Sequence, residues 1–194
     1  RDIGRCGEIV EESDGGGTVM ICMVLVAGYA TRLYPLTENF PKPLLDVGGK
    51  TILNWLLDDI DGQEEIEEHV IISNHKFIDH FEEWKKRQNY RHPIRLIDDG
   101  SMDNEHRLGA VKDMALAVNT LEKEEDTLVI AGDNVLDFSF KEFLTFGKEK
   151  GTSCVMCHEE TDPVKQRKTA IITVDESQKI TSYEEKPKEP KGNL

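Results

Sequence analysis

The sequence has little of three things: long apolar runs, cysteine and positive charge. None of its apolar stretches approaches the roughly 20 residues that span a bilayer, and no signal peptide opens the chain. Four scattered cysteines are too few for a disulfide framework, so we expect a cytoplasmic protein without a membrane partner. A net charge of −14 argues against polymeric DNA or RNA as a partner. The negative charge does not exclude a free nucleotide as a ligand, because a nucleotide brings its own magnesium.

Both ends of the chain differ from its middle. Residues 1 to 19 show neither helical nor strand periodicity over most of their length, whereas Met20 and Met23 stand where a strand begins. We therefore expect residues 1 to 19 to be irregular, or sequence added for expression or by read-through. Residues 20 to 194 are expected to form one domain. Because the chain stops soon after a proline-lysine run, we expect this domain to lack its C-terminal part.

Apolar periodicity predicts strands that alternate with helices. The expected strands cover residues 21–27, 69–73, 93–97 and 127–133, followed by 152–158, 169–175 and 179–185. The expected helices cover residues 51–60, 76–87, 108–121 and 140–150. Strands separated by helices predict βαβ units, and therefore an α/β fold whose mostly parallel sheet is buried on both faces.

Two of these strands end in residues suited to a phosphate ligand or to the magnesium that accompanies it. The first ends at Gly28 and leads to Thr31, Arg32 and, further on, Lys42. Glycine lets a backbone approach a phosphate closely, arginine offers a planar fork of donors, and lysine supplies a movable charge. The strand over residues 127–133 ends in an aspartate. Because ligands gather at the carboxyl ends of parallel strands, we expect these groups to share one site.

Asp133 is the candidate metal ligand of that site. Magnesium prefers oxygen ligands and usually shares itself with substrate phosphates, so the combination indicates a nucleoside triphosphate. A plain structural role for Asp133, in a turn or a helix cap, is equally open from the residues alone, since Asn134 and Ser139 suit such a role too.

The segment LVAGYATRLYPLTENFPKPLLDVGGK, residues 25 to 50, resembles the signature of the sugar-nucleotidyltransferase family, which includes glucose-1-phosphate thymidylyltransferases. Four further motifs continue the resemblance in the family's order: SNHKF at 73–77, RLGAVKDM at 107–114, IAGDN at 130–134 and EEKP at 184–187. Ala30 stands where the family usually has glycine, and Thr51 where proline is common. The family's second metal-binding aspartate would lie beyond Leu194.

The resemblance implies a fold, a reaction and a set of site residues. The fold is the three-layer, Rossmann-like nucleotide-diphospho-sugar transferase fold over residues 20 to 194, with a mostly parallel mixed sheet. The reaction joins a nucleoside monophosphate from a nucleoside triphosphate to a sugar 1-phosphate, with Mg²⁺, and releases pyrophosphate. The implied contacts are the catalytic Arg32 and Lys42, the nucleotide-binding Ala27, Gly28, Thr31, Arg32 and Gly109, the metal ligand Asp133, and the substrate-binding Glu185 and Lys186.

Several alternatives stay open at this point. The acceptor could be of the phosphocholine type with a cytidylyl donor, or the chain could be an incomplete nucleotide-binding domain without catalysis. Glu185 and Lys186, read without the family, are an ordinary charged end of a strand. The sequence leaves the base, the acceptor and the oligomeric state undecided.

Overall fold

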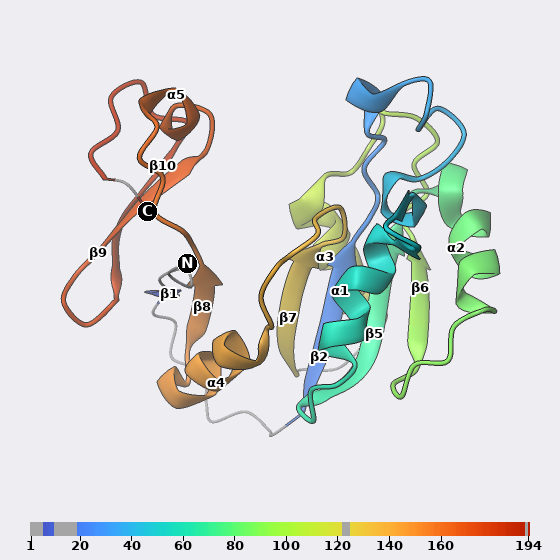
Figure 1. Cartoon of the computed structure of the whole chain (residues 1–194), viewed down its shortest axis with the longest axis horizontal. Helices are drawn as coiled ribbons and strands as arrows, with labels where there is room; N and C mark the ends of the chain where they lie inside the picture. The colour runs from blue at the N-terminus through green and yellow to red at the C-terminus, as the bar shows by residue number, and fades with distance from the viewer. Residues whose placement is uncertain (1–5, 10–18, 122–124, 193) are drawn as a thin grey trace. The chain divides into compact units, whose positions relative to one another are not determined.

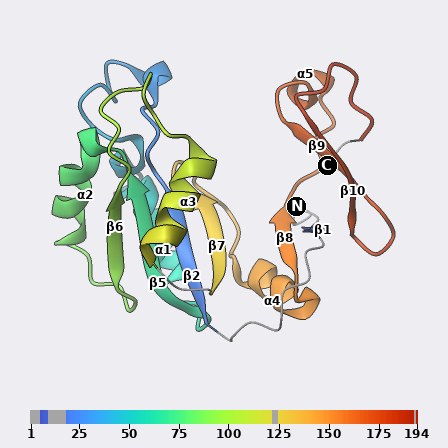
Figure 2. The ribbon, with the colours of Figure 1, turned by 180° about the vertical axis from the view of Figure 1, so that it is seen from behind.

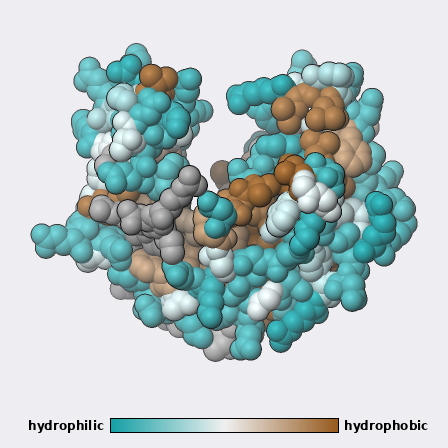
Figure 3. Space-filling view, in the orientation of Figure 1, coloured by the Kyte–Doolittle hydropathy of each residue, from teal (hydrophilic) through white to brown (hydrophobic). Residues whose placement is uncertain are grey.

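The computed structural model describes residues 6–9, 19–121, 125–192 and 194. The chain divides into two compact units, one of residues 16–139 and one of residues 1–15 together with 140–194. The sequence predicts one domain over residues 20–194, whereas the structure places a boundary between Ser139 and Phe140. Among the described residues, no helix has the length and apolar character that crossing a bilayer requires. Most of the face drawn in Figure 3 is hydrophilic, as the abundance of charged residues suggests.

The unit of residues 16–139 is built on a parallel sheet (Figure 1). Its strands lie in the order β6 (Ile94–Asp98), β5 (Ile66–Ser73), β2 (Met20–Leu25), β7 (Asp126–Ala131). All three neighbouring pairs are parallel. Parallel pairing puts the carboxyl ends of all four strands at one edge. The predicted phosphate-binding residues follow β2 there, and the predicted metal ligand follows β7.

Helices cover both faces of this sheet. Helix α1 (Ile52–Ile60) lies over one face and α3 (Ala110–Leu121) over the other, while α2 (Ile78–Lys85) lies beside β6 (Figures 1 and 2). On the α3 side, Ala117 and Leu121 pack against residues of β2 and β5, namely Ile21, Met23, Val70 and Ile72. Thr51 begins α1 because its side chain accepts a hydrogen bond from the backbone of Asn54 at 3.1 Å. The predicted three-layer α/β arrangement is confirmed.

Strand β7 differs from the expectation that it is buried on both faces. Leu128 is buried, but Val129 is 42% exposed. Neighbouring residues of a strand point to opposite faces, and Val129 pairs in register with Met23, on the face that α3 covers. Helix α3 contacts β2 and β5, so its cover is centred away from β7. In the part of the chain that the structure describes, β7 pairs with β2 alone.

The other unit consists of antiparallel pairs and two helices. Strand β1 (Cys6–Ile9) pairs with β8 (Ser153–Met156), and β9 (Ala170–Val174) pairs with β10 (Ile180–Glu185). The helices are α4 (Lys141–Lys150) and α5 (Pro163–Gln166). Residues 6 to 9 therefore differ from the irregular segment expected over residues 1 to 19. Four residues are too few for a periodic signal, and backbone pairing with β8 decides their conformation. Residues 1–5 and 10–18 lie outside the described residues.

Short elements complete the chain. The loop after β2 contains two 3-10 helices, η1 (Thr31–Leu33) and η2 (Lys42–Leu44), and a small hairpin of β3 (Asp46–Val47) and β4 (Lys50–Thr51). A third 3-10 helix, η3 (His75–Phe77), follows β5. These elements shape the carboxyl edge of the parallel sheet.

Candidate functional site

The loop after β2 leaves open space at its first glycine. Ala27 is buried, but Gly28 and Thr31 are exposed. A Cβ atom added to Gly28 would meet no other atom within 4 Å. The neighbouring side chains therefore do not force a glycine at this position, and its exposed backbone can be approached by a ligand.

A strained turn follows and presents Arg32. Ala30 adopts a left-handed conformation with φ 46° and ψ 41°, which costs an alanine more than the glycine usual in this motif. Its carbonyl accepts hydrogen bonds from the backbone of Leu33 at 2.9 Å and from the Thr37 hydroxyl at 2.8 Å. Thr37 is fully buried, so its hydroxyl fixes the turn that begins η1. Sequence reasoning missed Thr37, although it is the threonine of the Tyr-Pro-Leu-Thr string.

Arg32 itself is exposed on this turn. Within the described ranges, its guanidinium forms neither a hydrogen bond nor an ion pair with another residue. An arginine without an internal partner keeps its planar fork of donors available to phosphate oxygens.

Lys42 and Asp133 meet at the same edge of the sheet. The Lys42 Nζ donates a hydrogen bond to Asp133 Oδ2 at 2.9 Å, although the two residues are 91 positions apart. Lys42 begins η2 between two buried prolines, Pro41 and Pro43, whose fixed φ angles stiffen this part of the loop. The structure therefore brings together the predicted phosphate-binding lysine and the predicted metal ligand.

Gly132 explains how Asp133 reaches that position. A Cβ atom on Gly132 would lie 2.3 Å from Cγ1 of Val26, which real side chains do not tolerate. The Gly132 backbone instead donates to the Leu25 carbonyl at 3.0 Å and continues the pairing of β7 with β2. Glycine is required here because the chain passes directly against β2 before it turns at Asp133.

The SNHKF motif holds the start of the loop after β2. Asn74 is fully buried. Its Nδ2 donates to the Ala27 carbonyl at 3.0 Å, and its Oδ1 accepts from the Phe77 backbone at 3.0 Å. The asparagine thus fixes the residue before Gly28 and starts η3. No pattern in the sequence indicated this role of Asn74.

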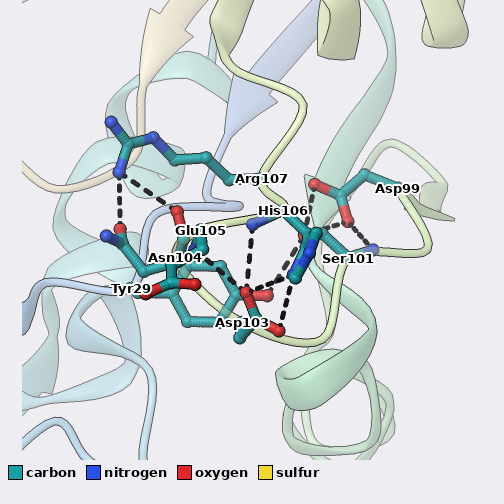
Figure 4. Close-up of polar contacts among 8 residues, drawn as sticks. All are labelled: Tyr29, Asp99, Ser101, Asp103, Asn104, Glu105, His106 and Arg107. Atoms are coloured by element: carbon teal, nitrogen blue, oxygen red, sulfur yellow. Dashed lines mark hydrogen bonds and ion pairs between the residues drawn. The ribbon is translucent and has the colours of Figure 1, made fainter.

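Gly109 lies where the loop after β6 enters α3. Its φ of 87° belongs to the region that favours glycine, and its carbonyl accepts from the backbones of Lys112 and Asp113, both at 3.0 Å. Figure 4 shows the preceding loop, in which His106 pairs with Asp103 and Arg107 donates to Asn104. The bond from His106 holds the pKa of the Asp103 carboxyl below its ordinary value.

Asp113 is an unexpected buried carboxylate in the first turn of α3. It is 4% exposed, and its Oδ1 has no hydrogen-bond partner among the described residues. Burial, with a smaller contribution from the charge of Asp99, raises the pKa of Asp113 to about 6. No sequence signal marked this residue, since an acidic residue in the first turn of a helix is common.

Glu185 and Lys186 belong to the other unit, at the end of β10. The Tyr183 hydroxyl donates to Glu185 Oε2 at 2.8 Å, and Lys186 Nζ lies 3.4 Å from Glu185 Oε1. These two contacts, the tyrosine bond first, lower the pKa of the Glu185 carboxyl. Lys186 has a positive φ of 47°. Such backbone strain in a residue other than glycine is often found at ligand-binding positions.

The exposed carboxylate of Asp133 has the oxygen atoms that magnesium prefers as ligands. The described part of the chain holds no group of three or more His, Cys, Asp or Glu residues that could bind a metal. Magnesium needs no such cage, because one or two carboxylates with substrate phosphates and water complete its shell. The Asp133 carboxylate is exposed, and among the described residues it accepts only from Lys42 and, at 3.3 Å, from Asn134.

Comparison with known proteins agrees with this geometry. A family model described as nucleotidyl transferase matches residues 21–194. The bifunctional protein GlmU of Methanococcus aeolicus is 32% identical over 177 residues, which are 90% of this chain and 38% of that protein. Mannose-1-phosphate guanyltransferase beta-B of Xenopus laevis is 34% identical over 171 residues, covering 87% of this chain and 45% of its own.

Solved structures share the fold. A protein described as a glucose-1-phosphate thymidylyltransferase from Bacillus anthracis superposes with a TM-score of 0.71 at 20% identity, over 90% of this chain and 68% of that one. A UDP-glucose pyrophosphorylase gives a TM-score of 0.70 at 17% identity, over 90% of this chain and 72% of that one. The fold predicted from the motifs is thereby confirmed.

The chain spans less than half the length of these two relatives: 38% of the GlmU protein and 45% of the guanyltransferase. The family model, in contrast, covers almost all of the residues from β2 onwards. The resemblance predicted from the ordered motifs is therefore confirmed, and the chain belongs to the nucleotidyl transferase family.

Proposed function

We propose that this chain joins a nucleoside monophosphate, taken from a nucleoside triphosphate, to a sugar 1-phosphate and releases pyrophosphate. The observation that carries the proposal is the contact of Lys42 with Asp133 at the edge where the exposed Gly28 loop begins. The names of several relatives support the acceptor class, since they describe transfer to mannose 1-phosphate and glucose 1-phosphate.

The chemistry is a displacement at phosphorus. An oxygen of the acceptor's phosphate attacks the α-phosphorus and forms the new P–O bond. The P–O bond to the β-phosphate breaks, and its electron pair leaves on pyrophosphate. The protein has little covalent work to do, because its main tasks are to align two anions that repel each other and to neutralise developing charge.

We assign the cations of the first loop to the phosphates. Arg32 would hold the β- and γ-phosphates that depart, since its guanidinium is exposed and has no partner among the described residues. Lys42 would contact the α-phosphate. The backbone around Ala27, Gly28 and Thr31 would approach the nucleotide.

We assign the remaining predicted residues to the nucleotide base and to the acceptor. Gly109 would contribute to the wall against the base, because its turn opens α3. Glu185 would accept hydrogen bonds from sugar hydroxyls, and Lys186 would pair with the acceptor's phosphate. Lys186 is a compact cation directly after a strand, which suits a phosphate.

Asp133 would hold Mg²⁺ together with phosphate oxygens of the nucleotide. When bound, the ion supplies positive charge that neutralises the triphosphate. Lys42 donates to the same carboxylate in this structure, so binding of the magnesium nucleotide would redirect its ammonium group from Asp133 to the α-phosphate.

We also assign the protein to the cytoplasm. Sugar 1-phosphates and nucleoside triphosphates are present there, and the chain has only four cysteines, of which Cys22 is a buried free thiol. The charge of −14 favours small anions accompanied by magnesium over polymeric nucleic acid.

A matrix of substrates tests the proposal. The complete gene product is incubated with each of several nucleoside triphosphates and each of several sugar 1-phosphates, with phosphocholine as a further acceptor, and pyrophosphate is measured. We expect release with a sugar 1-phosphate and Mg²⁺, loss of release with EDTA, and at least a roughly hundredfold fall in turnover for Arg32→Ala.

Arg87→Ala is the matched control, because Arg87 is an exposed arginine in the turn after α2, and it should keep wild-type turnover. Pyrophosphate release with phosphocholine and with none of the sugar 1-phosphates would show that the acceptor is of the phosphocholine type. Binding of a nucleotide without release in any combination would identify a nucleotide-binding module and contradict the proposal.

A further inference from the structure

Tyr29 points into the protein from the middle of the exposed phosphate loop. It is 3% exposed, whereas Gly28 before it and Thr31 after it are exposed. Its ring packs on Phe77 of η3, with ring centroids 6.0 Å apart and a 45° tilt. Its hydroxyl lies 3.1 Å from Ser101 Oγ, 72 positions away in the sequence. A residue between Gly28 and Ala30 thus reaches two other loops at this edge of the sheet.

The hydrogen bond has a definite direction. Ser101 Oγ donates to the Asp99 carboxylate, with distances of 2.7 Å to Oδ1 and 3.0 Å to Oδ2. A serine hydroxyl has a single proton to give, so the Tyr29 hydroxyl must donate to Ser101. Burial raises the pKa of the Tyr29 phenol, which keeps that donor protonated. The result is a chain of two hydrogen bonds, from Tyr29 to Ser101 and from Ser101 to the buried carboxylate of Asp99 (Figure 4).

The accepting end of this chain is fixed to the sheet. The Asp99 backbone donates to the Ser73 carbonyl at 2.9 Å, and the His75 backbone donates to the Ser101 carbonyl at 2.9 Å. The Ser101 backbone also donates to Asp99 Oδ1 at 2.7 Å. Asp99 and Ser101 therefore form a rigid start for the loop that runs on to Gly109. Buried, fully connected polar groups of this kind hold a single geometry.

We propose that Tyr29 is a positioning residue for the nucleotide, because its bond to Ser101 sets the spacing between the loop after β2 and the loop that leads to Gly109. This inference rests on the proposed function, which gives the phosphates to the first loop and the base to the second. Under that assignment the nucleotide contacts both loops and depends on the spacing between them, whereas the acceptor does not. Loss of the hydroxyl should therefore weaken nucleotide binding and leave acceptor binding and the chemical step largely intact.

Three variants of the complete gene product test it. Tyr29→Phe keeps the ring against Phe77 and removes the donor, Ser101→Ala removes the acceptor, and the double variant removes both. We expect each to raise KM for the nucleoside triphosphate roughly fivefold to tenfold, as the loss of one buried hydrogen bond implies. We expect kcat and KM for the sugar 1-phosphate to change less than about twofold. Ser101→Ala also removes the donor to Asp99, so the double variant should match Ser101→Ala, in which the Tyr29 hydroxyl has already lost its acceptor. Hydrogen exchange of residues 98–109 should be faster in all three.

Tyr34→Phe is the matched control. Tyr34 lies in the same loop but is 45% exposed, and within the described residues its hydroxyl makes no hydrogen bond. This variant should keep the wild-type KM for the nucleotide and the wild-type exchange rates.

The outcomes separate this inference from the function on which it rests. A wild-type protein that binds no nucleoside triphosphate would overturn both. An active wild-type protein whose Tyr29→Phe variant keeps its nucleotide KM would overturn only the role of Tyr29. A fall in Tm with both KM values and kcat altered alike would also overturn it, because that pattern belongs to a residue that only stabilises the fold. Additive effects in the double variant would show that Tyr29 does not act through Ser101.

Discussion

The Lys42 ammonium group donates to the Asp133 carboxylate at 2.9 Å. The two side chains are 28% and 49% exposed, so water screens the pair and its contribution to stability is about 0 to 1 kcal/mol. A contact of so little value to the fold leaves both side chains available for the ligand roles proposed for them.

Lys42→Ala should therefore separate activity from stability. In the complete gene product we expect turnover to fall at least roughly hundredfold, because a donor to developing charge at the α-phosphate is lost. The unfolding midpoint should change little. Lys86→Ala is the control, since it removes an exposed lysine that is paired with Glu83 and should leave turnover unchanged. Wild-type turnover in Lys42→Ala would rule out its assigned role.

Asp133→Asn should abolish the magnesium-dependent release of pyrophosphate. The amide keeps the size of the side chain but is a poor ligand for a hard cation. Pyrophosphate release should fall to background at every magnesium concentration, while circular dichroism stays as in the wild type. Asp126→Asn is the comparison, because Asp126 is exposed at the opposite end of β7. Full activity of Asp133→Asn with Mg²⁺ would show that the metal is held elsewhere.

Glu185→Gln should act on the acceptor alone. The carboxylate of Glu185 is assigned to the sugar hydroxyls, so its loss should raise KM for the sugar 1-phosphate by about tenfold. KM for the nucleoside triphosphate should stay constant. Steady-state kinetics with each substrate varied in turn makes the measurement. Equal changes in both constants would refute the assignment.

Ala30→Gly should stabilise the protein. The left-handed backbone of Ala30, with φ 46°, is relaxed by glycine, and we expect up to about 1 kcal/mol in the free energy of unfolding. Ala115→Gly should do the opposite, because Ala115 is an exposed residue inside α3, where glycine costs about 1 kcal/mol. Denaturant titration of both variants tests the difference in sign, and a destabilised Ala30→Gly protein would contradict it.

Asp113→Asn should stabilise the protein in a pH-dependent way. The pKa of Asp113 is raised from 3.8 to about 6 in the folded protein, so the folded state binds this proton more tightly than the unfolded state. The protonated side chain therefore favours folding below about pH 4, and this contribution is lost as the pH rises through 6. At pH 7.5 the variant should be more stable than the wild type by up to about 3 kcal/mol.

The difference between the two proteins, rather than either curve alone, makes the measurement, because other groups titrate as well. Asp99 is the charged neighbour that contributes to the raised pKa, and its carboxylate is present in both proteins. A gap that stays constant from pH 4 to pH 7.5 would show that Asp113 does not titrate in this range.

The sequence by itself determined the elements and the family. Periodicity predicts a helix over residues 51–60 and a strand over 179–185, where the structure has α1 at Ile52–Ile60 and β10 at Ile180–Glu185. These predictions succeed because the spacing of apolar side chains along one element is a local property. The motif from Leu25 to Lys50, with the later motifs in order, was sufficient to predict the nucleotidyl transferase family.

Only the tertiary structure decided which residues meet. The contacts of Lys42 with Asp133 and of Tyr29 with Ser101 join residues 91 and 72 positions apart, and no local pattern encodes such a distance. The exposed Val129 and the pairing of β1 with β8 were likewise outside the reach of the sequence. Burial depends on which helix covers a strand, and strand pairing depends on which backbone lies beside it, so both follow from packing and not from the order of the residues alone.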